Sequence, residues 1–163
     1  MIQHPILIPS WTEVADKIKN KRLYTVFDLK HGFYQVEIHE DPQKKCLFIT
    51  PFRAYKFLRL PFGIKTASKY FQYVNQKNFE GITGVFCYID DLVSADSEEE
   101  MDAVNQMVVE RAKEKNFKFN PEKLQYEQGK VKYLGRIFSE EGVSCDPERT
   151  RALLELQPPS IKK

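Results

Sequence analysis

The sequence predicts an α+β fold with a mainly antiparallel sheet flanked by helices, and three patterns support this class. Apolar residues recur at helical spacing in long segments, β-branched and aromatic residues fill shorter segments, and turn residues join some short segments into hairpins. Helices are interleaved with hairpins and do not alternate regularly with single strands, as they would around a parallel sheet. A length of 163 residues suits one domain with a substantial core.

The first sixty residues predict one helix and several extended segments. Ser10 and Glu13 have the spacing of a capping box, so we expect a helix over about residues 11–20. Extended segments are expected at residues 23–29, 35–38, 45–50 and 55–60. The last two should form a hairpin around the sequence PFRA.

The rest of the chain predicts two longer helices and further strands. Thr66 can cap a helix over about residues 67–79, with Tyr70, Phe71 and Val74 on its apolar face. A second capping box, SEEE at residues 97–100, begins a helix near 98–116. Its apolar stripe consists of Met101, Val104, Met107, Val108 and Ala112. Beyond it we expect extended pieces near 123–127 and 131–138, a turn at Gly142, and a short helix between Pro147 and Pro158.

Two adjacent acids, Asp90 and Asp91, lie inside the apolar run VFCYIDDLV at residues 85–93. Burying an unpaired carboxylate is costly. The flanking segments, 84–89 and 92–95, read as strands separated by two residues, which is hairpin spacing. The acids would then lie at a turn beside the sheet, and an exposed Asp-Asp turn without a function is one interpretation.

Asp28 offers a second interpretation, because it ends the apolar strand TVFDL at residues 25–29. If this strand neighbours the hairpin, Asp28, Asp90 and Asp91 come together and repel one another. A pair of Mg²⁺ ions, which prefer hard oxygen ligands, would relieve that repulsion. Two such ions about 3.5–4 Å apart can stabilise the attacking and leaving oxygens of a phosphoryl transfer.

The charge is unevenly distributed, although the net charge is only +2. Residues 42–79 contain Lys and Arg but no Asp or Glu, and carry a charge of +8, which leaves −6 for the remainder. Aromatic residues are interleaved with these bases, a pattern that suits a polyanion with stackable bases. On this interpretation the basic side chains of 42–79 should border the same cleft as Asp28 and Asp90. A solvated basic surface around ordinary core aromatics is the alternative. No segment has the length of a membrane span, and three widely spaced cysteines indicate a reducing compartment.

Several short motifs follow one another in a recognisable order. YIDDL at residues 88–92 resembles the YxDD motif of reverse transcriptases. VFDLKHGFYQV at 26–36 and LPFGIKTAS at 60–68 resemble two preceding blocks of that family, and NPEK, YLG and EGV follow at 120–123, 133–135 and 141–143. The chain therefore resembles the polymerase palm of gypsy-like LTR retrotransposon polyproteins, together with part of the fingers.

The resemblance implies two-metal nucleotidyl transfer from a deoxynucleoside triphosphate to a primer 3′-hydroxyl on an RNA or DNA template. Asp28, Asp90 and Asp91 would be the catalytic residues. The same three residues, with Leu29, would hold two Mg²⁺ ions, for which Mn²⁺ can substitute. The resemblance also implies an intracellular location, in cytoplasmic virus-like particles or in the nucleus, and no membrane partner.

The resemblance also assigns residues to the substrates. The nucleotide-binding residues would be Leu29, Lys30, His31, Gly32, Phe33, Phe62 and Lys123. Phe33 would exclude a ribose 2′-hydroxyl, although core packing is its ordinary role, and Lys123 is otherwise a solvated loop lysine. Nucleic acid would contact Pro61, Gly63, Tyr88, Tyr133, Leu134 and Gly135, the last three in a primer-grip hairpin.

On this resemblance, residues 1–163 are a reverse transcriptase domain fragment. The N-terminal fingers, the thumb, and the RNase H and integrase segments would lie elsewhere in a polyprotein, so little processive synthesis is expected from this chain alone. Two alternatives stay open. One is a non-catalytic nucleic-acid-binding remnant that uses residues 42–79, and the other is a different metal-dependent palm such as a nucleotide cyclase.

Overall fold

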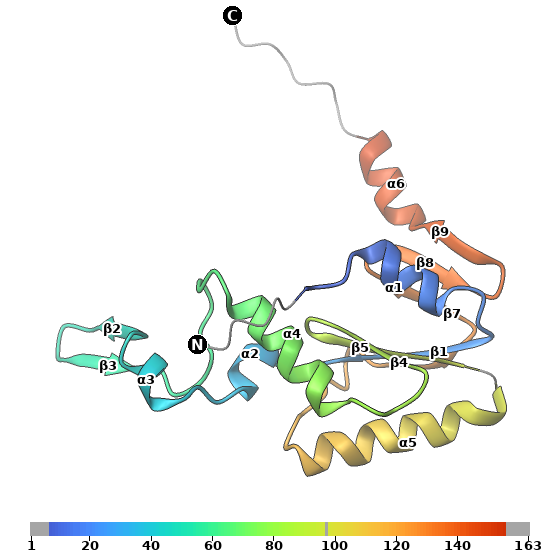
Figure 1. Ribbon diagram of the computed structural model, residues 1–163. Coiled ribbons are helices and arrows are strands. Elements are labelled where there is room, and N and C mark those ends of the chain that lie inside the picture. Colours follow the sequence, from blue (N-terminus) through green and yellow to red (C-terminus); the bar gives the residue numbers. More distant parts are fainter. Residues whose placement is uncertain (1–6, 97, 156–163) are drawn as a thin grey trace, which may run out of the picture.

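The computed structural model describes residues 7–96 and 98–155, and a four-stranded sheet forms its centre (Figure 1). The strand order is β4–β5–β1–β6, and every neighbouring pair is antiparallel. The four strands are β1 (Leu23–Asp28), β4 (Val85–Tyr88), β5 (Asp91–Asp96) and β6 (Gln125–Gln128). The predicted α+β class with a mainly antiparallel sheet is therefore confirmed.

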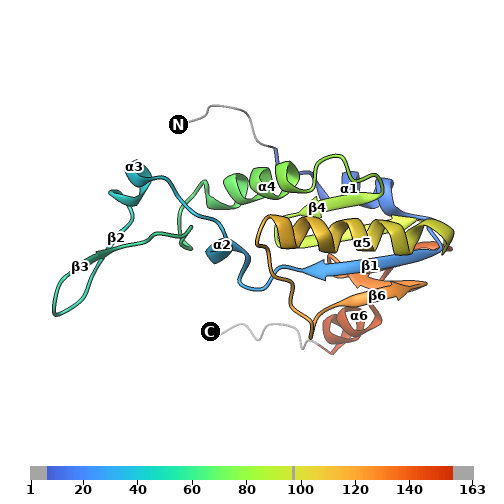
Figure 2. The same cartoon turned by 90° about the horizontal axis from the view of Figure 1, so that it is seen from below.

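Each face of this sheet carries its own apolar core, because successive residues of a strand point to opposite sides. Phe27 and Leu92 pack in one core with residues of α4 (Ala67–Asn78) and α5 (Glu98–Glu114). Val26 and Val93 pack in the other core with α1 (Trp11–Ile18). Figures 1 and 2 show α5 along one face of the sheet and α1 over the other.

A second, three-stranded sheet lies on the α1 side. It consists of β7 (Lys130–Tyr133), β8 (Arg136–Ser139) and β9 (Gly142–Cys145), and α6 (Pro147–Leu154) follows it. Val131, Tyr133 and Phe138 are buried in the same core as α1. The extended piece expected at 131–138 is thus two strands, because Leu134 and Gly135 both adopt positive φ and form the two-residue turn of a hairpin.

Residues 32–60 form an excursion from the two larger sheets, which ends where the chain returns to them before α4. After α2 (Gly32–Gln35) and α3 (Glu40–Gln43), the hairpin of β2 (Leu47–Ile49) and β3 (Ala54–Lys56) projects away from both sheets (Figures 1 and 2). The predicted hairpin is confirmed, with shorter strands. Its apolar side chains are largely uncovered, and Ile49 and Phe52 are 87% and 91% exposed.

The capping box of Ser10 and Glu13 is confirmed, since both of its reciprocal hydrogen bonds are present. The strand expected at 35–38 is wrong. Gln35 ends α2 there, because its side-chain amide donates to the carbonyls of Lys30 and Lys118 and accepts from the N–H of Lys118. The isolated bridge between Glu37 and Arg59 is the only extended pairing of 35–38 in the described chain.

Two details of the longer helices also differ from expectation. Thr66 precedes α4 but makes no side-chain cap, because its ψ of 0° departs from the extended conformation of capping residues. Met107 is 43% exposed, and Asn105 takes the inward position between Val104 and Val108. The expected cap of α5 involves Ser97, which lies outside the described residues.

Candidate active site

The β4–β5 hairpin places Asp90 in its turn and Asp91 at the first position of β5. Tyr88 pairs with Asp91, so the turn residues are Ile89 and Asp90, one position earlier than the sequence predicted. The difference arises at Ile89, whose backbone is left-handed with φ of 52°. The side chain of Gln72 accepts a hydrogen bond from the Ile89 N–H, over 2.6 Å, and holds the turn there.

Asp28 lies beside this hairpin because β1 pairs with β5 and Asp28 is the direct partner of Asp91. The N–H of the next residue, Leu29, donates to the carbonyl of Asp90 over 2.8 Å, which joins the end of β1 to the turn. Gly32 completes the contact. A methyl group on Gly32 would overlap the Asp90 carboxylate and the ring of Phe71, so glycine is needed for this close approach.

The three carboxylates influence one another. Burial, and then the charge of Asp28, raise the pKa of Asp90 above its ordinary value. Burial raises the pKa of Asp91 to about 6, with further contributions from the charges of Asp28 and Asp90. Like charges in a half-buried site are unfavourable, so this arrangement favours a neighbouring cation.

Lys123 supplies one cation from the loop that precedes β6. Its Nζ lies 3.0 Å from Oδ2 of Asp28, and the hydrogen bond and charge of Asp28 raise the pKa of Lys123. The neighbouring Asn120 donates its N–H to the backbone carbonyl of Asp28 over 2.8 Å. Lys123 is thus directed at the carboxylates and is not a loop lysine without contacts.

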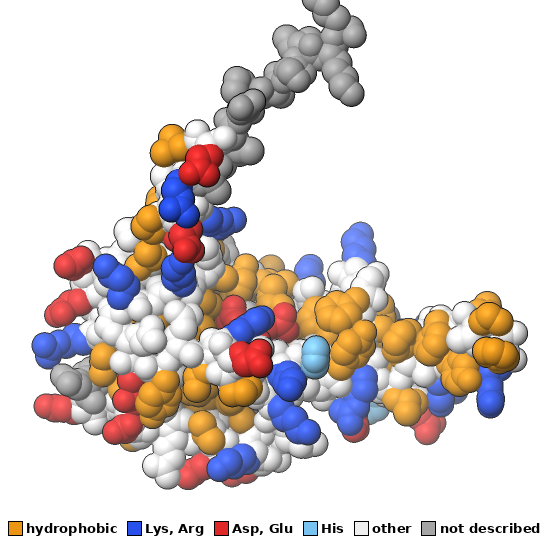
Figure 3. All heavy atoms as spheres, turned by 180° about the vertical axis from the view of Figure 1, so that it is seen from behind, with side chains coloured by type: hydrophobic (Ala, Val, Ile, Leu, Met, Phe, Trp, Pro, Cys, Tyr) orange, Lys and Arg blue, Asp and Glu red, His pale blue; other side chains and the backbone are white. Residues whose placement is uncertain are grey.

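A pocket of about 430 Å³ opens beside these groups. It is lined by Asp28, Leu29, Lys30, His31, Gly32, Phe62, Asp90, Asn120, Pro121, Glu122 and Lys123. Figure 3 shows acidic and basic side chains close together at the centre of this face, with a histidine beside them. Six of the seven predicted nucleotide-binding residues therefore lie around one hollow.

Phe33 is the seventh predicted nucleotide-binding residue and does not line the pocket. It is 8% exposed, and its ring packs against Phe71 at 4.9 Å and stacks on Phe62 at 5.0 Å between centroids. Phe62 is 63% exposed and also meets Tyr34 edge-on. The ring of Phe33 thus supports Phe62 from the core side.

The residues predicted to contact nucleic acid lie in separate places. Tyr133 is buried in the α1-side core, where Tyr88 and Leu134 pack against it. Gly135 has φ of 70°, and a methyl group there would overlap the guanidinium of Arg149. Pro61 is buried and Gly63 is exposed with φ of 85°, both in the loop before α4.

The basic residues of 42–79 do not border the pocket, contrary to the prediction that they would share its cleft. Phe62 is the one member of that stretch among the lining residues. Several of these bases have local partners, because Lys44 pairs with Asp41, Arg59 with Glu37, and Arg53 lies over Tyr55. The cations beside the carboxylates are Lys30 and Lys123, which come from other segments.

Sequence reasoning missed several side chains that hold the site together. Gln35 bonds the backbone at Lys30 and Lys118, Asn120 fixes Asp28, and Gln72 with Asn75 holds Ile89. Polar residues that interrupt an apolar helix face were the available signal for the last two. Gln35 and Asn120 stand within the quoted motifs, but nothing in their spacing indicates their partners.

The donor set suits a hard divalent cation. Asp28, Leu29 and Asp90 line the pocket, and Asp91 pairs with Asp28 beside it. The carboxylate oxygens of Asp28 and Asp90 are hard ligands of the kind that Mg²⁺ prefers. Within residues 7–96 and 98–155, however, no group of three or more Asp, Glu, His or Cys side chains is placed to hold a metal ion. The described helices also include none that is long and apolar enough to cross a membrane.

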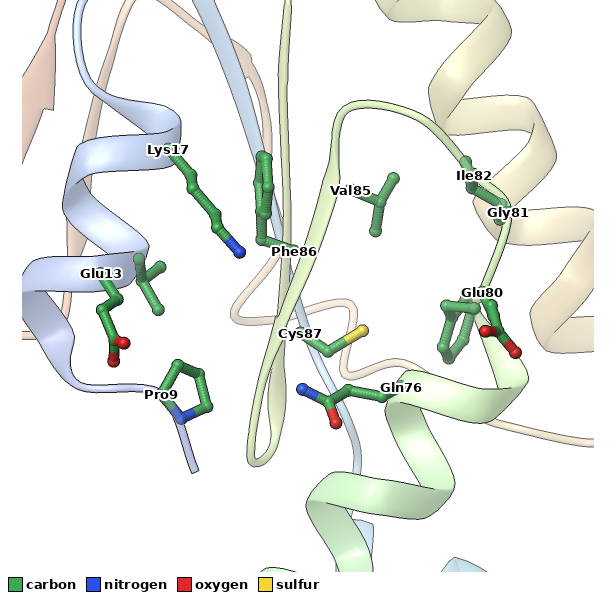
Figure 4. A pocket seen from close by; sticks show the side chains of 12 residues that line it. Pro9, Glu13, Lys17, Gln76, Glu80, Gly81, Ile82, Val85, Phe86 and Cys87 are labelled. Atoms are coloured by element: carbon green, nitrogen blue, oxygen red, sulfur yellow. The ribbon is translucent and has the colours of Figure 1, made fainter. Parts of the chain in front are cut away.

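A second pocket, of about 310 Å³, lies between α1, β4 and the end of α4 (Figure 4). Figure 4 shows Glu13 and Lys17 of α1 on one side and Gln76 and Glu80 on the other. This pocket shares no lining residue with the first one, and its lining includes none of Asp28, Asp90 and Asp91.

Comparison with solved structures identifies the fold as that of reverse transcriptases. The foamy viral protease-reverse transcriptase in complex with RNA/DNA hybrid superposes with a TM-score of 0.87 over 96% of this chain and 21% of that chain, at 18% identity. The same viral protein in complex with double-stranded DNA gives 0.86 over 98% of this chain and 33% of that chain, also at 18% identity.

Sequence comparison then gives the family. The family model for reverse transcriptase (RNA-dependent DNA polymerase) matches residues 2–138. An uncharacterized protein of Caenorhabditis elegans, K02A2.6, is 34% identical over 98% of this chain and 12% of its own length. The retrovirus-related Pol polyprotein from transposon gypsy of Drosophila melanogaster is 31% identical over 93% of this chain and 15% of its own. The chain belongs to the reverse transcriptase family and spans less than a sixth of these two relatives.

Proposed function

We propose that this chain is the palm of an RNA-directed DNA polymerase, in which Asp28 and Asp90 bind divalent metal and Asp91 assists them. The observation that carries the proposal is that Asp28 and Asp90 line one pocket and that Asp91, the strand partner of Asp28, lies beside them. Burial and the neighbouring carboxylates raise the pKa of both Asp90 and Asp91. Bound Mg²⁺ would supply the charge that activates a primer 3′-hydroxyl and stabilises the leaving pyrophosphate. Family membership favours this chemistry over that of a nucleotide cyclase.

The protein's own residues would bind and orient the substrates. Leu29, Lys30 and His31 line the pocket, where their backbone would receive a triphosphate, with Lys30 and Lys123 offering positive charge. The exposed ring of Phe62 can meet the nucleobase or sugar, and Phe33, stacked on it from the core side, would limit room for a 2′-hydroxyl by holding Phe62 in place. Positioning and charge neutralisation would account for most of the rate enhancement.

The nucleic-acid partner is a primed RNA or DNA template, and the fingers, thumb, RNase H and integrase segments would belong to the same polyprotein. Two solved neighbours are complexes with an RNA/DNA hybrid and with double-stranded DNA, which supports this partner by analogy. The matched relatives include retrovirus-related Pol polyproteins, which supports the longer context. An intracellular location is part of the same proposal. The positions of the basic residues of 42–79 do not favour a separate binding module.

Primer extension tests the proposal. The chain is incubated with a primed RNA template, deoxynucleotides and Mg²⁺ or Mn²⁺, and compared with Asp90→Asn and with Glu110→Gln, an exposed acid of α5 that does not line the pocket. We expect addition of at least one nucleotide by the wild type and by Glu110→Gln, and none by Asp90→Asn. Equal extension by all three proteins would refute the role of Asp90.

A further inference from the structure

Two polar side chains of α4, Gln72 and Asn75, are fully buried in the described structure. They lie one turn apart on the helix face that also carries the buried Phe71. A buried amide is costly unless its polar atoms are hydrogen-bonded. Burial of Gln72 and Asn75 beside an apolar core is therefore favourable only if their amide groups have hydrogen-bond partners.

Those partners are backbone atoms of the hairpin that carries Asp90. Gln72 donates from Nε2 to the carbonyl of Cys87 over 2.8 Å and accepts at Oε1 from the N–H of Ile89 over 2.6 Å. Asn75 donates from Nδ2 to the carbonyl of Ile89 over 2.5 Å. Both polar groups of the Ile89 backbone are thus bonded to side chains of a single helix.

Ile89 needs such support because its φ of 52° is rare for a β-branched residue. Its carbonyl belongs to the peptide that joins it to Asp90. Rotation of Ile89 towards ordinary φ would turn that peptide and redirect the Asp90 carboxylate, while the N–H of Leu29 holds the Asp90 carbonyl from the other side. Backbone strain of this kind persists where surrounding contacts over-determine it.

The side-chain oxygen of Asn75 also supports a positioning role for this residue. Oδ1 of Asn75 is buried and has no hydrogen-bond partner among the residues that the structure describes. An apolar side chain of similar size would avoid that cost, so Asn75 is suited to its Nδ2 donor and not to packing. Figure 4 shows Cys87 of β4 turned towards α4, in agreement with the pairing of these two elements.

We propose that Gln72 and Asn75 are positioning residues, which lock the strained Ile89 turn and so aim the Asp90 carboxylate at the metal site. This inference rests on the proposed function and deepens it. Neither side chain lines the carboxylate pocket, so both act through the backbone of Ile89. Their role is comparable to that of residues that orient metal ligands without contacting the metal themselves. Loss of such residues typically weakens metal affinity.

Mn²⁺ binding measured by electron paramagnetic resonance tests this role. Gln72→Met and Asn75→Leu, each close in size to the original, should weaken Mn²⁺ binding about 10- to 100-fold. Gln76→Leu, on the exposed side of the same helix, is the matched control and should bind like the wild type. Thermal unfolding of each metal-free variant shows whether a loss of binding merely follows a loss of stability.

The variants separate the two proposals. If Asp90→Asn abolishes Mn²⁺ binding but Gln72→Met and Asn75→Leu bind normally, the positioning role is refuted and the proposed function stands. If Asp90→Asn leaves binding unchanged, the proposed function fails and the positioning role fails with it. Asn75→Leu removes one hydrogen bond together with the unpartnered oxygen, so it keeps the test decisive should Gln72→Met not fold.

Discussion

At the scale of single residues, Asp91 has the more strongly raised pKa of the two adjacent acids of the β4–β5 hairpin. It lies directly opposite Asp28 in the β1–β5 pair, where like charges destabilise a sheet. Its pKa is raised to about 6 from the ordinary 3.8. Between these two pH values the Asp91 carboxyl is protonated in the folded protein but ionised in the unfolded chain. The free energy of unfolding therefore declines as pH rises towards about 6, where Asp91 loses its proton in the folded protein as well.

We expect the unfolding free energy of the metal-free protein to fall by at most about 3 kcal/mol, through Asp91 alone, between about pH 4 and pH 7. Asp91→Asn should remove this part of the pH dependence, because the amide does not titrate. Urea unfolding of both proteins across that range measures the difference. Parallel stability curves would contradict the raised pKa of Asp91.

Gly32 lies so close to the Asp90 carboxylate that a side chain there must displace it or Phe71. Gly32→Ala should therefore abolish primer extension and destabilise the fold by about 1–3 kcal/mol through overpacking. Gly129→Ala is the control, since its added methyl would meet only the carbonyl of Arg22 at 3.6 Å, an ordinary contact. Unchanged extension by Gly32→Ala would show that the Asp90 position is not constrained by this contact.

The residues most accessible to sequence reasoning were the acids, since Asp28, Asp90 and Asp91 stand out in apolar segments. Gln72 and Asn75 could not be assigned in this way. On a helix they resemble ordinary polar positions, and their role depends on meeting Ile89 from a different element. The left-handed φ of Ile89 also depends on that tertiary contact, which explains why the turn was predicted one residue too late.

At the scale of elements, a buried polar network fixes α5 on the sheet. Asn105 of α5 is 1% exposed, and its amide bonds Ser94 of β5, Thr25 of β1 and Glu127 of β6. Glu127 in turn donates its N–H to the hydroxyl of Thr25. Three strands and one helix are therefore held in a single arrangement by one side chain.

Asn105→Leu should destabilise the protein by about 1–3 kcal/mol, because it leaves buried polar partners unpaired. Gln106→Leu, one residue on and exposed, should change stability by less than about 0.5 kcal/mol. Chemical denaturation of the two variants beside the wild type measures both effects. A neutral Asn105→Leu would mean that apolar packing replaces the network without loss.

The helices were predictable because capping residues and apolar stripes are local signals. Asn105 explains the main error in the α5 stripe, since a buried amide occupies a position that periodicity assigns to apolar residues. The incorrect strand at 35–38 has a similar origin. The side chain of Gln35 is hydrogen-bonded to the backbone of Lys118, which lies more than eighty residues away in the sequence. A local sequence pattern cannot predict such a partner.

At the scale of the whole molecule, the pocket forms where four distant segments meet, around residues 28–32, 62, 90 and 120–123. The order of the motifs identified the family, and the spacing of Asp28 and Asp90 led to the site. The orientation of the basic residues could not be predicted, because a charge count over 42–79 does not state which side of the projecting hairpin each side chain faces.

The projecting β2–β3 hairpin exposes apolar side chains, including Ile49 and Phe52, on a chain that spans a small part of its relatives. Exposed apolar patches promote association. Ile49→Lys combined with Phe52→Ser should lower the sedimentation coefficient at high protein concentration and reduce binding of an apolar dye. Metal binding should not change, since neither residue lines the carboxylate pocket. Unaltered sedimentation would contradict a role of this hairpin in association.

Anomalous diffraction from crystals grown with Mn²⁺ would locate bound metal relative to the three carboxylates. We expect a strong anomalous peak bounded by the carboxylates of Asp28 and Asp90, with Asp91 nearby and Lys123 displaced from Asp28. The peak should be absent from crystals of Asp90→Asn. A peak confined to other acidic residues, or none at concentrations that support primer extension, would contradict the assignment of these carboxylates as the metal ligands.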